Sequence, residues 1–178
     1  MPDQSTATAE SLTHESARAL FERAYELLNT RDTKRVPEIF TEDIVFVDDA
    51  WPETVRGHAE MKRFLGAVWT AFPDFRFELI DAYLGEAAGS AAAHVRVSGT
   101  MNGPLDPPGF APTGRRLATE YGGFYEFDGE RISRGRIIVN MNDAATQLGA
   151  LPPPGSKGER AAVMVQRLQA RFMRRRGR

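Results

Sequence analysis

The chain has 178 residues, of which 42% are hydrophobic, so it can build one domain with a sizeable core but is too short for two ordinary domains. It contains no cysteine, which excludes disulfides, thiolate metal sites and cysteine nucleophiles, and its three histidines are too scattered for a histidine-based metal site. The net charge of −1 hides an uneven distribution, because residues 151–178 carry eight basic residues against one acidic residue and the rest of the chain therefore carries −8.

The N-terminal residues 1–10 are polar and rich in alanine, and we expect them to be disordered. This end of the chain lacks the basic and then apolar pattern of a secretory signal peptide. No apolar run approaches the roughly 20 residues that a membrane-spanning helix needs. These features predict a cytoplasmic protein without a membrane span.

Helices dominate the predicted structure of the first 72 residues. The sequence predicts a helix over 11–28, a short helix over 33–40, a short buried strand over 44–47 and a helix over 57–72 that Pro73 ends. One side of the first helix is apolar at steps of three and four residues, namely at Ala17, Leu20, Phe21, Ala24, Tyr25 and Leu28.

Residues 75–141 predict an antiparallel sheet, because apolar and polar side chains alternate along them. Asp128-Gly129 is a strong hairpin signal, since both residues tolerate the positive φ angles of a tight turn. The loop over 102–114 is long for a hairpin connection, and loops of that length often cover or rim a site.

A family resemblance rests on three short segments and on Asn140, which lies between the last two of them. The segments are Gly114-Arg115-Arg116, Gly129-Glu130-Arg131-Ile132 and Gln147-Leu148-Gly149-Ala150. In this order they resemble the SnoaL-like polyketide cyclases, a branch of the nuclear-transport-factor-2-like superfamily. The resemblance covers about residues 12–150. It implies an α+β fold, a cone-shaped barrel in which a curved antiparallel sheet wraps around three N-terminal helices and encloses an apolar pocket. We therefore divide the chain into disordered residues 1–10, a SnoaL-like domain at 11–150, and a linker with a basic helical tail at 151–178.

Three residues are candidate catalytic groups. Asn140 stands where the cyclases have an acid–base aspartate; we expect a buried amide in the last strand, which is either a structural link or, as the resemblance favours, a donor to a ligand oxygen. Asp49 stands where the related ketosteroid isomerases have their proton-shuttling aspartate, and we expect it to transfer protons, whereas Asp48 braces the turn or is solvated. Tyr121 is the candidate phenolic donor, with a role in the core as the alternative.

The resemblance implies an enzyme that uses neither a metal nor an organic cofactor. We expect it to act on a small apolar, carbonyl-bearing ring compound, such as a polyketide intermediate, by proton transfer or ring closure. The candidate substrate-binding residues are Trp51, Phe64, Trp69, Phe110 and Tyr25. Because the family aspartate is replaced by asparagine, two alternatives stay open: a SnoaL-like hydroxylating tailoring protein, or a non-catalytic ligand-binding or assembly module.

The C-terminal tail begins with a linker at 151–156 and continues as an amphipathic helix that ends in Arg174-Arg175-Arg176. An isolated helix of this kind needs a surface to lie on. We favour the acidic body or a homodimer over a membrane, and expect no nucleic acid because no aromatic residues interleave the arginines to stack on bases. The homodimer is expected to form through the outer face of the sheet.

Overall fold

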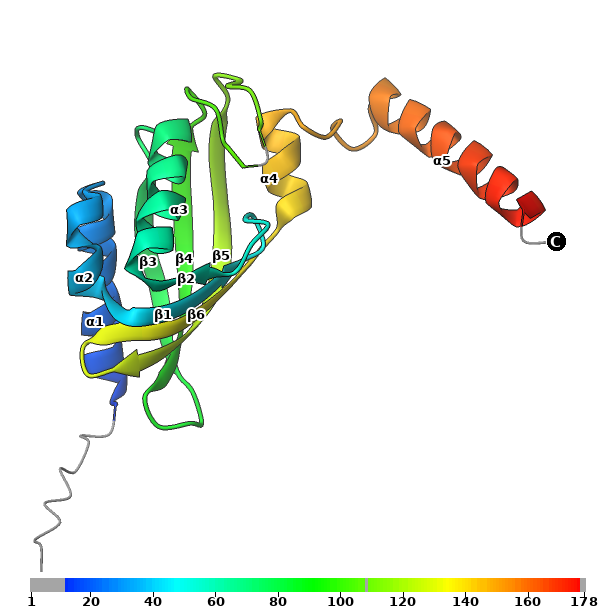
Figure 1. Cartoon of the computed structure of the whole chain (residues 1–178). Coiled ribbons are helices and arrows are strands. Elements are labelled where there is room, and N and C mark those ends of the chain that lie inside the picture. Colours follow the sequence, from blue (N-terminus) through cyan, green and yellow to red (C-terminus); the bar gives the residue numbers. More distant parts are fainter. Residues whose placement is uncertain (1–11, 108, 177–178) are drawn as a thin grey trace, which may run out of the picture.

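The computed structural model describes residues 12–107 and 109–176, so the predicted disorder of residues 1–10 lies outside the described part of the chain. Figure 1 shows a curved sheet with helices packed against one side and a separate C-terminal helix. The helices are α1 (His14–Asn29), α2 (Val36–Ile39) after a 3₁₀ turn at Thr33–Arg35, α3 (Gly57–Ala71), α4 (Met141–Leu148) and α5 (Lys157–Arg176). The strands are β1 (Phe40–Asp48), β2 (Val55–Arg56), β3 (Arg76–Leu84), β4 (Ser90–Thr100), β5 (Arg116–Asp128) and β6 (Arg131–Val139).

The sheet has six strands in the order β2-β1-β6-β5-β4-β3, and its two edge strands do not close into a barrel. The expected α+β fold with a curved sheet is confirmed, but the sheet is mixed, because β1 and β6 run parallel. A parallel pair requires a long crossover, and here the chain between the two strands supplies α3 and the rest of the sheet. The register of this pair shifts between Phe40 and Val45, a bulge that bends the strand.

Helix α1 is fixed at both ends by side chains. The Thr13 hydroxyl accepts a hydrogen bond from the Ser16 amide at 3.1 Å and so caps the first turn. At the other end the Asn29 amide donates to the Phe77 carbonyl at 2.9 Å and accepts from the Phe77 amide at 2.8 Å. Because Phe77 lies on the edge strand β3, Asn29 both ends the helix and anchors it to the sheet.

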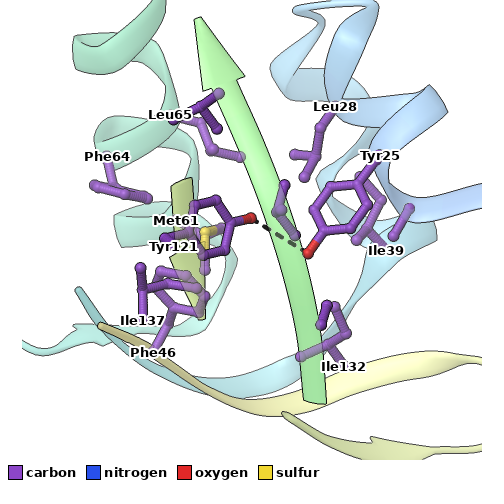
Figure 2. Packing of buried hydrophobic residues seen from close by; sticks show 14 of the residues in the cluster. Tyr25, Leu28, Ile39, Phe46, Met61, Phe64, Leu65, Tyr121, Ile132 and Ile137 are labelled. Carbon is purple, nitrogen blue, oxygen red and sulfur yellow. Dashed lines mark hydrogen bonds between the residues drawn. The ribbon is translucent and has the colours of Figure 1, made fainter. Parts of the chain in front are cut away.

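The core between α1 and the sheet is centred on Phe21, whose side chain is fully buried. Its ring lies 5.1 Å from that of Tyr125 and 5.3 Å from that of Phe127, both in edge-to-face contact. Figure 2 shows further apolar side chains, among them Leu28, Met61 and others from the helices and strands, pointing toward one another. This packing fixes α1 against the strands that carry the candidate site.

The outer face of the sheet carries a charged network and a small apolar patch. Glu120 accepts a hydrogen bond from Arg96 at 3.0 Å and shares one with His94 at 2.8 Å. The apolar patch consists of Phe124 and Ile138, which are 54% and 50% exposed on the same face of the sheet. The homodimer expected through this face stays a prediction.

The predicted hairpin and the predicted long loop are both present. Strand β5 ends at Asp128 and β6 begins at Arg131, with Gly129 between them at φ +59°. The loop between β4 and β5 is closed at its base, where Met101 donates to the Arg115 carbonyl at 2.9 Å. In the described part of the chain, no helix is long and apolar enough to cross a membrane.

Candidate active site

A cavity of about 510 Å³ lies between the sheet and the helices. Residues of α1, α3, α4, β1, β5 and β6 and of the loop between β4 and β5 line it. Its wall is mostly apolar and rich in rings: Tyr25, Phe40, Phe46, Trp51, Phe64, Phe72, Phe75, Phe77, Phe110, Tyr121 and Tyr125. Such a volume and lining suit a small organic molecule with extended apolar surface.

Four of the five predicted substrate-binding residues line this cavity. Tyr25, Trp51 and Phe64 are buried in its wall, whereas Phe110 is 47% exposed and lies where the cavity opens to solvent. Trp69 does not line it. It is a buried core residue of α3 whose indole nitrogen has no hydrogen-bond partner among the described residues, so its predicted contact with substrate is corrected.

Three tyrosines form a hydroxyl cluster in the cavity wall, which we call the tyrosine cluster: Tyr25, Tyr121 and Tyr125. The Tyr121 hydroxyl donates to that of Tyr25 at 3.2 Å (Figure 2), and the hydroxyls of Tyr25 and Tyr125 share a second hydrogen bond, also 3.2 Å. Three hydroxyl groups supply three protons, and these two bonds use two of them. One proton is therefore left to be donated to a ligand.

Burial keeps the tyrosine cluster protonated. It raises the pKa of Tyr25 to about 12, against the lowering effect of its two hydrogen bonds. It also raises the pKa values of Tyr121 and Tyr125 well above the ordinary value, with the neighbouring phenols adding to the shift. The cluster can thus donate hydrogen bonds at neutral pH and resists ionisation.

Asp48, the last residue of β1, is the carboxylate that lines the cavity. Its side chain accepts a hydrogen bond from the Ala50 amide at 2.8 Å. Burial raises the pKa of Asp48 to about 6; the Ala50 hydrogen bond lowers it and the nearby charge of Asp49 raises it further. A carboxylate with this pKa can both take up and release a proton near neutral pH.

Asp49 has the opposite orientation. It does not line the cavity, and its carboxylate accepts a hydrogen bond from Arg136 at 2.6 Å in an exposed ion pair. Strand β1 ends at Asp48 and Asp49 lies in the turn that follows, and of these two carboxylates only that of Asp48 lines the cavity. The expectation that Asp49 is the carboxylate at the cavity is therefore corrected, whereas the expectation that Asp48 braces the turn agrees with its hydrogen bond from the Ala50 amide.

The strand register brings Asp48 and the tyrosine cluster to one region of the cavity. Asp48 of β1 pairs with Ile137 of β6, which pairs with Gly123 of β5. The Tyr125 hydroxyl lies over Gly123, where even a methyl side chain would clash with it. Two strand spacings separate the backbones of Asp48 and Gly123, about 10 Å, and both Asp48 and Tyr125 line the cavity.

Asn140 lies outside the cavity lining, and its predicted burial in the last strand is wrong. It is an exposed residue at the N-terminal end of α4, where its side-chain oxygen accepts from the Asp143 amide at 3.1 Å. Strand β6 ends one residue earlier, at Val139. The Asn140 side chain thus caps the first turn of α4.

The end of α4 closes one side of the cavity and is anchored to β5. Gln147 accepts from the Ala118 amide at 2.8 Å and donates to the Ala118 carbonyl at 3.0 Å. Gln147 also donates to Asp143, which in turn accepts from the buried Thr119 of the cavity wall.

Among the described residues, no group of three or more histidines or carboxylates is arranged to hold a metal ion.

Three residues of the site are not among those predicted from the sequence: Asp48, Tyr125 and Gly123. The signal for Asp48 was available, because Ile44 and Phe46 are buried and the same alternation, continued by one step, points Asp48 inward. Gly123 had no such signal. Its importance comes from the Tyr125 side chain that lies over it.

Comparison with known proteins agrees with this architecture. The sequence profile of the SnoaL-like domain family matches residues 21–135, which is more than half of the chain. No curated protein matches the chain.

Several solved structures share the fold at low sequence identity. AclR from Streptomyces galilaeus, a candidate hydroxylase, is 22% identical with a TM-score of 0.66, covering 90% of this chain and 98% of that one. A candidate SnoaL-like polyketide cyclase from a Jannaschia species is 14% identical with a TM-score of 0.66, covering 86% and 100%. A protein with a ketosteroid isomerase-like fold from Catenulispora acidiphila, solved with trimethylamine, is 14% identical with a TM-score of 0.60, covering 73% and 92%.

These structural likenesses establish the fold, and the profile match over residues 21–135 establishes the family. The resemblance drawn from the three short sequence segments and Asn140 is confirmed. The chain belongs to the SnoaL-like domain family.

Proposed function

We propose that this protein is an enzyme that moves a proton on an apolar, carbonyl-bearing ring compound held in the cavity. Asp48 is the proton-transfer group and the tyrosine cluster binds the carbonyl oxygen. One observation carries the proposal: an otherwise apolar cavity holds a carboxylate whose pKa is raised to about 6 and, across from it, a hydroxyl cluster with one proton to spare.

The reaction begins when the Asp48 carboxylate takes a proton from the carbon next to the carbonyl. The electron pair of that C–H bond moves into the carbonyl group, and the resulting enolate oxygen accepts a hydrogen bond from the tyrosine cluster. If Asp48 returns the proton to a different carbon, the product is an isomer. If the enolate carbon attacks a second carbonyl, a ring closes and Asp48 gives its proton to the new alkoxide.

The proposal predicts an activity that rises with pH. Only ionised Asp48 can accept a proton, so kcat/KM should increase through an apparent pKa of about 6 and level off above it. The measurement is exchange of α-carbon hydrogens for deuterium, followed by NMR on a panel of bicyclic and tricyclic aromatic ketones. An exchange rate that does not change between about pH 5 and pH 8 contradicts the assignment of Asp48 as the base.

The tyrosine cluster is tested by replacing its central member. Tyr25→Phe removes the central hydroxyl and with it both hydrogen bonds that orient the hydroxyls of Tyr121 and Tyr125. We expect kcat to fall about 10²-fold with little change in KM, because donors that are no longer held in place stabilise the charge of the transition state less well. The control is Tyr83→Phe, since Tyr83 is 51% exposed and does not line the cavity. Equal rates for the two variants would exclude the Tyr25 hydroxyl from catalysis.

Hydroxylation of an apolar ring compound is a second candidate function. It is favoured by the likeness to AclR, a candidate hydroxylase. The two candidates differ in whether dioxygen is consumed, which an oxygen electrode records alongside the exchange assay. Tight binding of the ketones with neither exchange nor oxygen consumption would instead identify a ligand-binding module.

A further inference from the structure

Helix α5 presents an apolar stripe that nothing in the described structure covers. Figure 1 shows the helix projecting away from the domain at the end of its linker. Val165 is 50% exposed, Leu168 47% and Phe172 65%. Exposed large apolar residues arranged along one side of a helix indicate a docking surface.

Basic residues form a second stripe on the same helix. At 3.6 residues per turn, the stripe of Ala161, Val165, Leu168 and Phe172 runs along one side, and a stripe of arginines runs about 120° around the helix from it. The arginine stripe consists of Arg160, Arg167, Arg171 and Arg174, all exposed. Over its whole length α5 carries seven basic residues against Glu159, a net charge of +6.

The charge of α5 disfavours pairing with a second copy of itself, because two helices of +6 would repel each other. The apolar patch of Phe124 and Ile138 on the outer face of the sheet is also a poor docking surface for α5. Phe124 lies directly across from Arg136 in the strand register, and the ion pair of Arg136 with Asp49 leaves no net negative charge there. A suitable surface must accept apolar side chains and be negatively charged.

The apolar residues at the opening of the cavity are no better as a docking surface for α5. Phe110 and Met141 are exposed there, but the guanidinium of Arg115 lies against Gly149, which lines the same opening. The arginine stripe would meet a like charge at this position. Neither of these two apolar patches combines its apolar side chains with a net negative charge.

We propose that α5 docks on an anionic lipid surface. The apolar stripe enters the boundary between headgroups and acyl chains, and the arginine stripe lies among the negative headgroups, as in other interfacial amphipathic helices. This goes beyond the proposed function and does not depend on it. It also differs from the expectation drawn from the sequence, that the basic tail packs on the acidic body or across a homodimer. These two arrangements become outcomes of the test.

Docking would bring the opening of the cavity close to the lipid. Leu148, Gly149 and Ala150 line the cavity, and only the six residues of the linker at 151–156 separate them from α5. A linker of six residues spans at most about 20 Å. A docked α5 therefore holds the cavity opening within reach of a bilayer, which is where an apolar ligand would accumulate.

The test is co-sedimentation of the full chain with vesicles. We expect binding to vesicles of mixed phosphatidylglycerol and phosphatidylcholine, with little binding to phosphatidylcholine alone and a decrease at high salt. Replacing Leu168 and Phe172 together by glutamate should weaken binding by more than about tenfold, because both apolar anchors are lost.

The matched control places two glutamates on the opposite side of the same helix, at Gln166 and Ala170. Both double variants change the net charge equally and at the same spacing, and circular dichroism checks that each keeps its helix. The control should retain most of the binding. Equal losses in both variants, or vesicle binding that the Leu168→Glu, Phe172→Glu variant keeps, would overturn the proposal.

Two further results would also overturn it. In the first, the wild-type chain binds no vesicles and forms a dimer in size-exclusion chromatography with light scattering, whereas the Leu168→Glu, Phe172→Glu variant is a monomer. This would assign α5 to a second copy of the chain. The other is binding to duplex DNA, with no vesicle binding, that both double variants weaken equally, since they lower the positive charge equally.

Discussion

The variant Asp48→Asn is expected to lower the rate of α-carbon proton exchange by about 10²- to 10⁴-fold, the usual contribution of a positioned acid–base group. The amide keeps an oxygen that can accept the Ala50 hydrogen bond, so the turn after β1 is retained. What is lost is the ability to take up a proton. The measurement is the NMR exchange assay at a pH above about 7, where the wild-type carboxylate is ionised.

The matched control is Asp49→Asn. It makes the same chemical change one residue away, on a side chain that pairs with Arg136 outside the cavity. We expect this variant to keep nearly all of the wild-type rate. A large loss in Asp49→Asn with normal exchange in Asp48→Asn would restore the assignment predicted from the sequence and contradict the one made from the structure.

The same Asp48→Asn variant is expected to be more stable than the wild type at alkaline pH. Burial raises the pKa of Asp48 from 3.8 to about 6, so protonation favours the folded state. The contribution of this group to stability is fully present below about pH 4 and is lost as the pH rises through about 6. Asparagine carries no charge, so above this range it should raise the free energy of unfolding by on the order of 1 to 3 kcal/mol.

Urea denaturation at about pH 5 and pH 8 tests this, because the gain should be larger at the higher pH. A loss of activity together with a gain in stability is characteristic of a residue held in an unfavourable environment for its chemistry. A variant that is inactive because it fails to fold would show the reverse, a lower free energy of unfolding at both pH values.

The variant Phe21→Ala is expected to reduce the free energy of unfolding by about 3 to 5 kcal/mol. Phe21 is fully buried, and its ring packs edge to face against Tyr125 and Phe127 and stacks on Tyr25. Removing the ring leaves a cavity between α1 and the sheet that rigid neighbours cannot fill. A loss of this size is a large fraction of the total stability of a small domain.

Phe124→Ala is the control for this variant, because it deletes the same side chain from a position that is 54% exposed on the outer face of the sheet. We expect a change in the free energy of unfolding below about 1 kcal/mol. Urea denaturation of both variants provides the comparison. If both variants lose about 3 to 5 kcal/mol, Phe124 is covered in solution, as the predicted homodimer requires. If both lose less than about 1 kcal/mol, Phe21 contributes less to stability than its packing indicates.

The secondary structure could be predicted from local pattern because the physical causes are local. Apolar residues recur at steps of three and four along the first helix, which predicts that Phe21 and Tyr25 lie on its buried side, and both are buried in α1. Gly57 and Asp128-Gly129 mark the start of α3 and the turn before β6 through backbone conformation alone. The parallel pairing of β1 with β6 depends on contacts between distant segments, which no local pattern reveals.

The candidate site was predicted less well, because its geometry depends on where strands end. Asn140 was assigned to the last strand because an apolar run precedes it, but Asn140 with Asp143 three residues later is also typical of a helix N-terminus. Asp48 and Asp49 are adjacent, and a shift of one residue exchanges the side chain that faces the cavity. The family resemblance named the region of the site correctly, whereas the strand register decided between the two carboxylates.

The position of β6 between β1 and β5 has a consequence for the order of assembly. Before β6 is available, β1 can pair only with the two-residue strand β2. Since β6 ends at Val139, a growing chain must be synthesised almost to the end of the domain before the strand that carries Asp48 finds its long neighbour. Contacts between such distant segments form slowly, so this wall of the cavity is expected to be among the last parts of the domain to fold on the ribosome.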